Sequence, residues 1–128
     1  NGYGPNQYRR LAASGKPIAL FGKGEERRDH VFIDDVSEII TRVLKHRSEG
    51  KLNIATGTVT SFHEIAELVL RHFNSSAGIE YKPRSGPMPH KGYRPFTIDA
   101  CYAAFPDFTY TPIPDGIAWV HRKMMENK

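Results

Sequence analysis

A chain of 128 residues, of which 39% are hydrophobic and 25% charged, is too short for two full domains and too apolar for wholesale disorder. Its formal net charge of +4 raises the question of a polyanionic partner, but the basic residues are spread along the chain, usually with acidic residues nearby. We therefore expect no nucleic acid as a partner, and a few arginines that converge on one small phosphorylated ligand explain the excess equally well.

The hydrophobic pattern alternates between strand-like and helix-like segments without a repeat or an internal linker, which predicts an α/β fold in a single unit. In the first half of the chain, we expect a helix over 7–14, strands over 18–21 and 30–33, a helix over 35–46 and a strand over 52–55. In the second half, we expect a helix over 62–73, strands over 79–81 and 96–98, a helix over 99–104 and a last helix after 112 or 114. Residues 22–26 are predicted to form a polar turn, and the Pro- and Gly-rich residues 82–95 an irregular loop.

Two of the predicted helices begin with the spacing of a capping box, in which the first and fourth residues bond each other's backbone N–H groups. Asp35 is followed three residues later by Glu38, and Ser61 in the same way by Glu64. Apolar residues then recur at helical period in both segments. Helix capping therefore explains Asp35 better than a metal or general-base site shared with Asp34 would.

The other reactive residue types do not form a recognisable site. None of the six histidines has the spacing of a helical metal pair, so no metal ligand is predicted. Cys101 is the single cysteine, and we expect it to be a small buried thiol rather than a nucleophile. One cysteine forms no disulfide within the chain, which fits a reducing, cytoplasmic location.

The ends of the chain and its hydropathy carry two further expectations. No run is apolar enough for a membrane span, so no membrane partner is expected. The segment 1–10 contains neither an initiator Met nor the apolar core of a signal peptide, which suggests that the chain begins within a longer protein.

Three arginines fall where a scaffold commonly displays binding groups. Arg28 follows a glycine-bearing turn, and Arg84 and Arg94 lie in the long loop 82–95. A guanidinium is a planar fork that pairs with two phosphate oxygens, which suits a diphosphate. On composition alone, three surface arginines in weak salt bridges are the favoured interpretation.

Several runs of sequence, in this order along the chain, favour ligand binding over surface salt bridges for these arginines. They are NGYGP (1–5), GKPIALFGKGEERRDHVFIDDV (15–36), LNIATG (52–57), TSFHEIAELV (60–69), RSG (84–86), RPFTID (94–99) and GIAWV (116–120). Together they resemble the C-terminal half of the NAD-dependent epimerases and dehydratases of nucleotide sugars, the extended short-chain dehydrogenases. The resemblance covers most of the chain.

The resemblance implies a fold and a domain organisation. In that family an N-terminal Rossmann domain binds NAD or NADP, and a smaller C-terminal part binds the nucleoside diphosphate sugar. Residues 1–128 would then be a single partial unit, the C-terminal substrate-binding region, with partial Rossmann-type parallel strands and a small α/β substrate domain. Within it, 16–57 would pack on the absent N-terminal domain. Because family members often dimerise, a homodimer is an expected assembly.

The resemblance also assigns substrate-binding residues, position by position. Asn1 matches an asparagine that contacts the sugar nucleotide near its diphosphate, and Arg28 matches an arginine that grips the diphosphate. Arg84, in the RSG run, matches a second phosphate-binding arginine. Arg94 is a weaker match, because its position beside the RPFTID run could equally be structural.

Two elements of the family's hydride chemistry are not in this sequence. No Gly-rich turn joins a strand to a helix in the dinucleotide-binding pattern, and no tyrosine is followed four residues later by lysine. The parent protein is therefore expected to be an NAD- or NADP-dependent epimerase or dehydratase whose cofactor and catalytic residues lie elsewhere. The alternative is a non-catalytic module that binds a nucleotide or another protein.

Overall fold

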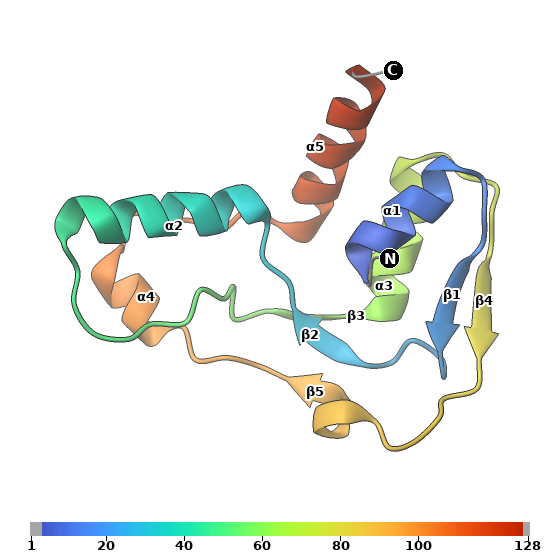
Figure 1. The fold of residues 1–128 in the computed structure, drawn as a ribbon, viewed down its shortest axis with the longest axis horizontal. Coiled ribbons are helices and arrows are strands. Elements are labelled where there is room, and N and C mark those ends of the chain that lie inside the picture. Colours follow the sequence, from blue (N-terminus) through green and yellow to red (C-terminus); the bar gives the residue numbers. More distant parts are fainter. Residues whose placement is uncertain (1–3, 127–128) are drawn as a thin grey trace.

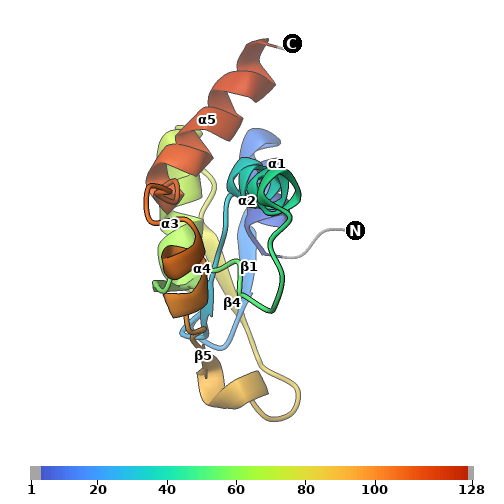
Figure 2. The same ribbon diagram turned by 90° about the vertical axis from the view of Figure 1, so that its left-hand side faces the viewer.

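The computed structural model describes residues 4–126 as a flat, elongated assembly of helices and short strands, seen face-on in Figure 1 and along its length in Figure 2. The elements in chain order are α1 (Pro5–Ala13), β1 (Ile18–Phe21), β2 (Arg27–Asp29), α2 (Ile33–His46), β3 (Val59–Ser61), α3 (Phe62–His72), β4 (Ile79–Lys82), the short 3-10 helix η1 (Pro89–Gly92), β5 (Tyr93–Arg94), α4 (Asp99–Ala104) and α5 (Ile113–Glu126). This is the mixed α/β class that the sequence predicts.

Two small sheets connect these elements. Strand β1 pairs in parallel with β4, so that Ile18 lies opposite Ile79. In the second sheet, β2 is central, antiparallel to β3 on one side and parallel to β5 on the other. Arg28 therefore lies opposite Thr60 in one ladder and opposite Arg94 in the other. The central strand of this sheet is the element that carries the first candidate arginine.

A first hydrophobic core lies between α1, α3 and β1, at one end of the molecule (Figure 1). Ile18 and Ile65 are fully buried in it, and the rings of Tyr8 and Phe62 meet edge to face with centroids 6.4 Å apart. Helix α3 begins with the predicted capping box, because the Ser61 hydroxyl accepts from the Glu64 N–H while the Glu64 carboxylate accepts from the Ser61 N–H. The capping box and the apolar face of α3 both form as the sequence predicts.

A second core forms at the other end, between α2, α4 and the residues that follow α4. Ile39 of α2 is fully buried there against Phe105 and Phe108. The Cys101 thiol is buried as expected and lies 3.3 Å from the Tyr110 hydroxyl. Burial, together with this hydrogen bond, raises the pKa of Tyr110 well above its ordinary value of 10.0.

Helix α2 begins differently from the prediction. It starts at Ile33, two residues early, with Phe32 as N-cap and without a side-chain capping bond. The Asp35 carboxylate, 7% exposed, instead accepts hydrogen bonds from the Thr111 N–H (2.7 Å) and hydroxyl (2.8 Å). The capping-box prediction for Asp35 is wrong, because a residue 76 positions away in sequence provides better donors. The predicted end at His46 is confirmed.

The strand predictions at 18–21 and 79–81 are confirmed by β1 and β4, which pair with each other. The strands predicted at 30–33 and 96–98 are wrong, because the ladder of the second sheet uses the residues just before them, in β2 and β5. The predicted strand at 52–55 is wrong for the described residues. That segment is extended without a ladder partner, and its Leu52 and Ile54 side chains pack against the second core.

Candidate functional site

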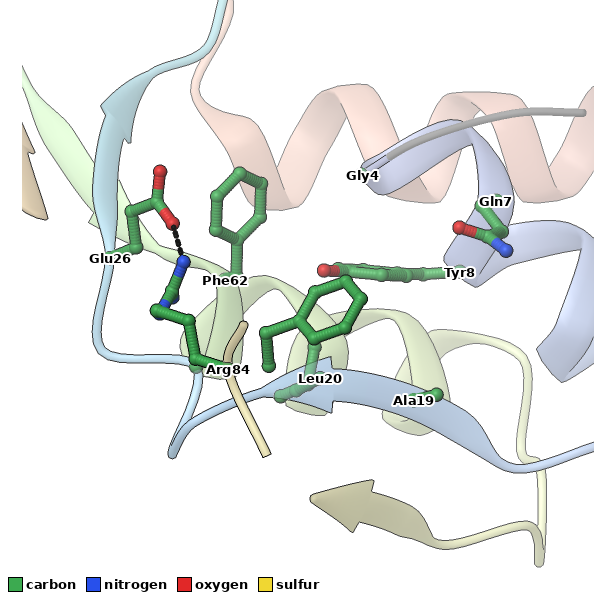
Figure 3. Close-up of a pocket in the computed structure, with 10 residues that line it drawn as sticks. Gly4, Gln7, Tyr8, Ala19, Leu20, Glu26, Phe62 and Arg84 are labelled. Carbon is green, nitrogen blue, oxygen red and sulfur yellow. Dashed lines mark ion pairs between the residues drawn. The ribbon is translucent and has the colours of Figure 1, made fainter. Parts of the chain in front are cut away.

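The two arginines with the strongest expectation, Arg28 and Arg84, converge on one carboxylate. Arg28 lies in the middle of β2, and Arg84 follows β4 by two residues. Glu26, just before β2, forms an ion pair with each: Arg28 Nη2 contacts Glu26 Oε1, and Arg84 Nη1 lies 3.1 Å from Glu26 Oε2. Figure 3 shows the Arg84 and Glu26 side chains pointing toward one another. Residues that are 56 positions apart in sequence therefore form one cluster.

Glu26 is the residue of this cluster that sequence reasoning missed, since it was assigned only to a polar turn. It is 3% exposed, and its carbonyl oxygen accepts a hydrogen bond from the Phe62 N–H at 3.1 Å. Residues i and i+2 along an extended segment project to the same face. The placement of Glu26 two residues before Arg28 was therefore a signal available in the sequence.

The arginine side chains are mostly buried, at 18% exposed for Arg28 and 20% for Arg84. The guanidinium of Arg28 also donates to its neighbour's carbonyl oxygen, Arg27 O, at 2.8 Å and to Pro89 O at 3.4 Å, which ties β2 to η1. Arg84 Nε is buried and has no hydrogen-bond partner within residues 4–126. The cluster therefore keeps one buried donor that is not used.

A pocket of about 50 Å³ adjoins the cluster and is shown in Figure 3. Its polar wall is formed by Glu26 and Arg84, and its apolar wall by Leu20 and the rings of Tyr8 and Phe62. A pocket of this size has room for a few water molecules, and its polar wall is already occupied by the ion pair between Arg84 and Glu26. In this conformation both arginines are paired with the Glu26 carboxylate.

A larger hollow of about 700 Å³ lies between α1, α3 and α5. Its lining is mainly apolar, and it includes Arg9, whose buried Nε has no hydrogen-bond partner within residues 4–126. Two other polar residues of the lining, Asp29 and His30, are engaged with neighbouring backbone groups. The Asp29 carboxylate accepts from the N–H groups of Thr56 (3.0 Å) and Gly57 (2.9 Å), and His30 Nδ1 lies 3.0 Å from Arg28 O. Burial lowers the pKa of His30 below its ordinary value of 6.5. The hollow therefore offers mainly apolar surface, with Arg9 Nε as a buried donor that is not used within residues 4–126.

The other two candidate residues are not part of the cluster. Arg94 is exposed, with Nη1 3.2 Å from His90 Nε2 and its guanidinium carbon 5.3 Å from the centre of the Phe96 ring. Its backbone is the ladder neighbour of Arg28, yet no contact of its side chain with Glu26 is found. Asn1 lies outside the described residues.

Within residues 4–126, the glycines after β1 do not form a pyrophosphate site of the Rossmann type. A pyrophosphate site of the Rossmann type needs a Gly-rich turn that leads from a strand into a helix N-terminus. The glycines that follow β1, Gly22 and Gly24, lead instead into strand β2. Over residues 4–126 no group of three or more His, Cys, Asp or Glu side chains is placed to hold a metal ion. No helix in the same range is long and apolar enough to cross a membrane.

Comparison with known proteins identifies relatives by sequence. The profile of the NAD dependent epimerase/dehydratase family matches residues 4–55. UDP-glucuronic acid decarboxylase 1 of Arabidopsis thaliana is 28% identical over 75 residues, a match that covers 59% of this chain and 17% of the relative. UDP-glucuronic acid decarboxylase 2 of the same plant is 26% identical over 76 residues, with the same shares of 59% and 17%.

Solved structures share the fold over almost the whole chain. An epimerase of Methanothermobacter thermautotrophicus has a TM-score of 0.86 at 21% identity, covering 98% of this chain and 38% of that protein. UDP-glucose 4-epimerase of Thermotoga maritima, solved with UDP-glucose, has a TM-score of 0.82 at 17% identity, covering 96% and 39%. For dTDP-glucose 4,6-dehydratase of Bacillus anthracis, solved with NAD, the TM-score is 0.79 at 20% identity, covering 99% and 43%.

The chain therefore has the mixed α/β fold of these epimerase and dehydratase structures. The predicted resemblance to the NAD dependent epimerase/dehydratase family is confirmed over residues 4–55. The chain spans 17% of the length of the curated relatives and about two fifths of the solved ones, 38% to 43% in the three structures described above.

Proposed function

We propose that this chain forms the substrate-binding part of an NAD- or NADP-dependent epimerase or dehydratase, and that Arg28 and Arg84 bind the diphosphate of a nucleoside diphosphate sugar. The observation that carries this proposal is that both guanidinium groups converge on one buried carboxylate, that of Glu26. A carboxylate held between two arginines is chemically similar to a phosphate group in the same place.

The chemistry of the cluster fits a diphosphate. Each guanidinium presents parallel N–H donors, and two of them from separate strands suit two adjacent phosphate groups. The unused Nε donor of Arg84 adds a further hydrogen bond for an incoming anion. The curated relatives are named for UDP-glucuronic acid, and the Thermotoga maritima structure contains UDP-glucose. A uridine diphosphate sugar is therefore the first substrate class to test.

Asn1 and Arg94 belong to the outer part of the proposed site. Arg94 lies on β5, next to Arg28 in the ladder, from where its exposed side chain reaches a ligand that extends past the two inner arginines. Asn1 is assigned only by the family resemblance. Both are proposed to contact the substrate, while Arg28 and Arg84 neutralise most of the charge of its diphosphate.

The remainder of the proposed enzyme is a dinucleotide-binding domain against which residues 16–57 pack. Support comes from helix α2, where Ile33, Ile40 and Leu44 are exposed by 66%, 48% and 72%. The extended segment 52–55 also lacks a strand partner within residues 4–126. Bound NAD or NADP would supply hydride transfer, and this chain's residues would hold the substrate in place. A cytoplasmic location is proposed from the single cysteine, and a homodimer on the family resemblance alone.

The proposal is tested by calorimetric titration of the full-length protein with UDP. Replacing Arg28 or Arg84 by Ala removes charge-assisted hydrogen bonds of about 1.5–3 kcal/mol each, so Kd should rise at least about tenfold. Arg27→Ala is the matched control, because Arg27 lies beside Arg28 on β2 with a half-exposed side chain 4.0 Å from Glu64. An unchanged Kd for both Arg28→Ala and Arg84→Ala would reject the diphosphate site.

A further inference from the structure

Resting on the proposed function, we infer that Glu26 sets the affinity of the site: its carboxylate occupies the place of the ligand's anion and limits how tightly the two arginines bind a diphosphate. Glu26 pairs with Arg28 through one carboxylate oxygen and with Arg84 through the other. Each arginine that the proposed function assigns to the ligand is therefore already held by the protein's own negative charge.

Burial makes this pairing energetically important. The Glu26 side chain is 4% exposed, and the arginine side chains are 18% and 20% exposed, so water screens the three charges poorly. Two positive charges and one negative charge leave the cluster with a net charge of +1. Without Glu26, the same two arginines would present a charge of +2 to a diphosphate.

Space in the site leads to the same conclusion. The adjoining pocket is small, about 50 Å³, and the arginines beside it are paired with Glu26, so a ligand that binds them must take over contacts that Glu26 now holds. A phosphate oxygen that bonds to these guanidinium groups would lie within about 6 Å of the carboxylate, at which distance like charges repel appreciably in a poorly solvated site. Glu26 thus holds the arginines together in the free protein and opposes the anion that replaces it.

The inference predicts that removal of the Glu26 charge tightens ligand binding. In the full-length protein, Glu26→Gln keeps the shape of the side chain and should lower the Kd for UDP about tenfold, with inorganic pyrophosphate as a second probe. Without ligand, the variant should melt at a lower temperature because the arginines lose their counter-ion, and UDP should raise its melting temperature more than that of the wild type. A residue with a purely structural role would lower both stability and affinity.

Glu25→Gln is the matched control. It removes the same charge from the neighbouring position, but the Glu25 side chain is exposed and accepts from the Lys23 N–H at 2.7 Å. It forms no ion pair with Arg28 or Arg84, and Arg84 acts on its pKa only as a minor coulombic contribution. We expect its Kd for UDP to stay within about twofold of the wild type, since exposed charges are well screened. Should Glu26→Gln not fold, Glu26→Asp withdraws the carboxylate from the arginines and should still tighten UDP binding, to a smaller extent.

The outcomes separate this inference from the proposed function. If Arg28→Ala and Arg84→Ala weaken UDP binding while Glu26→Gln leaves it unchanged or weaker, the inference about Glu26 is rejected and the diphosphate site stands. If the arginine variants have no effect on UDP binding, the proposed function itself fails. Tighter binding by Glu26→Gln but not by Glu25→Gln supports both.

Discussion

The link between Asp35 and Thr111 gives a sharp test of what holds α5 in place. The Asp35 carboxylate is buried near the start of α2 and accepts two hydrogen bonds from Thr111, two residues before α5. A hydrogen bond to a charged group contributes about 1.5–3 kcal/mol, and the two bonds share one carboxylate, so Asp35→Ala should cost about 3 kcal/mol of unfolding free energy. Urea unfolding of the full-length protein measures this cost.

Asp34→Ala is the control for this prediction. Asp34 is exposed in the same first turn of α2, so its removal costs only the interaction with the helix dipole, about 0.3–1 kcal/mol. Hydrogen exchange adds a local readout, because Asp35→Ala should speed amide exchange in residues 111–126 and Asp34→Ala should not. Equal costs for the two variants would refute the assignment of Asp35 to the Thr111 link.

Two further predictions concern stability. Burial lowers the pKa of His30 below 6.5, so the unfolded state binds more protons than the folded one, and stability should fall as the pH drops through about 6.5. His30→Gln should remove this part of the pH dependence in thermal melts recorded from pH 5 to 8. An unaltered pH profile of the variant would contradict this prediction. Ser61→Ala breaks the capping box of α3 and should cost about 1 kcal/mol in urea unfolding, whereas Ser76→Ala, at an exposed loop position, should cost almost nothing. Equal effects of the two serine variants would argue against the capping role.

Local signals in the sequence predict several elements whose hydrogen-bond partners lie within this chain. The capping box of α3, the strand at 18–21 and the end of α2 at His46 all depend on neighbouring residues or on a strand pair that the chain contains. The segment 52–55 shows the limit of such signals. Its pattern is that of a buried strand, but a strand needs a partner for its backbone groups, and none is present within residues 4–126.

The residues of the candidate site were also predictable only in part. The family resemblance singles out Arg28 and Arg84, and the fold brings them together, although 56 residues separate them in sequence. The spacing of Glu26 and Arg28 was a local signal for their pairing, but the burial of Glu26 and the approach of Arg84 from the loop after β4 depend on the fold and are not encoded in local periodicity. Asp35 was likewise misassigned because its partner, Thr111, is distant in sequence.

The most direct test of the diphosphate site is a structure of the full-length protein with UDP bound. The account predicts that guanidinium nitrogens of Arg28 and Arg84 lie within about 3 Å of diphosphate oxygens, with at least one of their ion pairs to Glu26 broken. A diphosphate bound elsewhere, with both arginines still paired to Glu26, would contradict it.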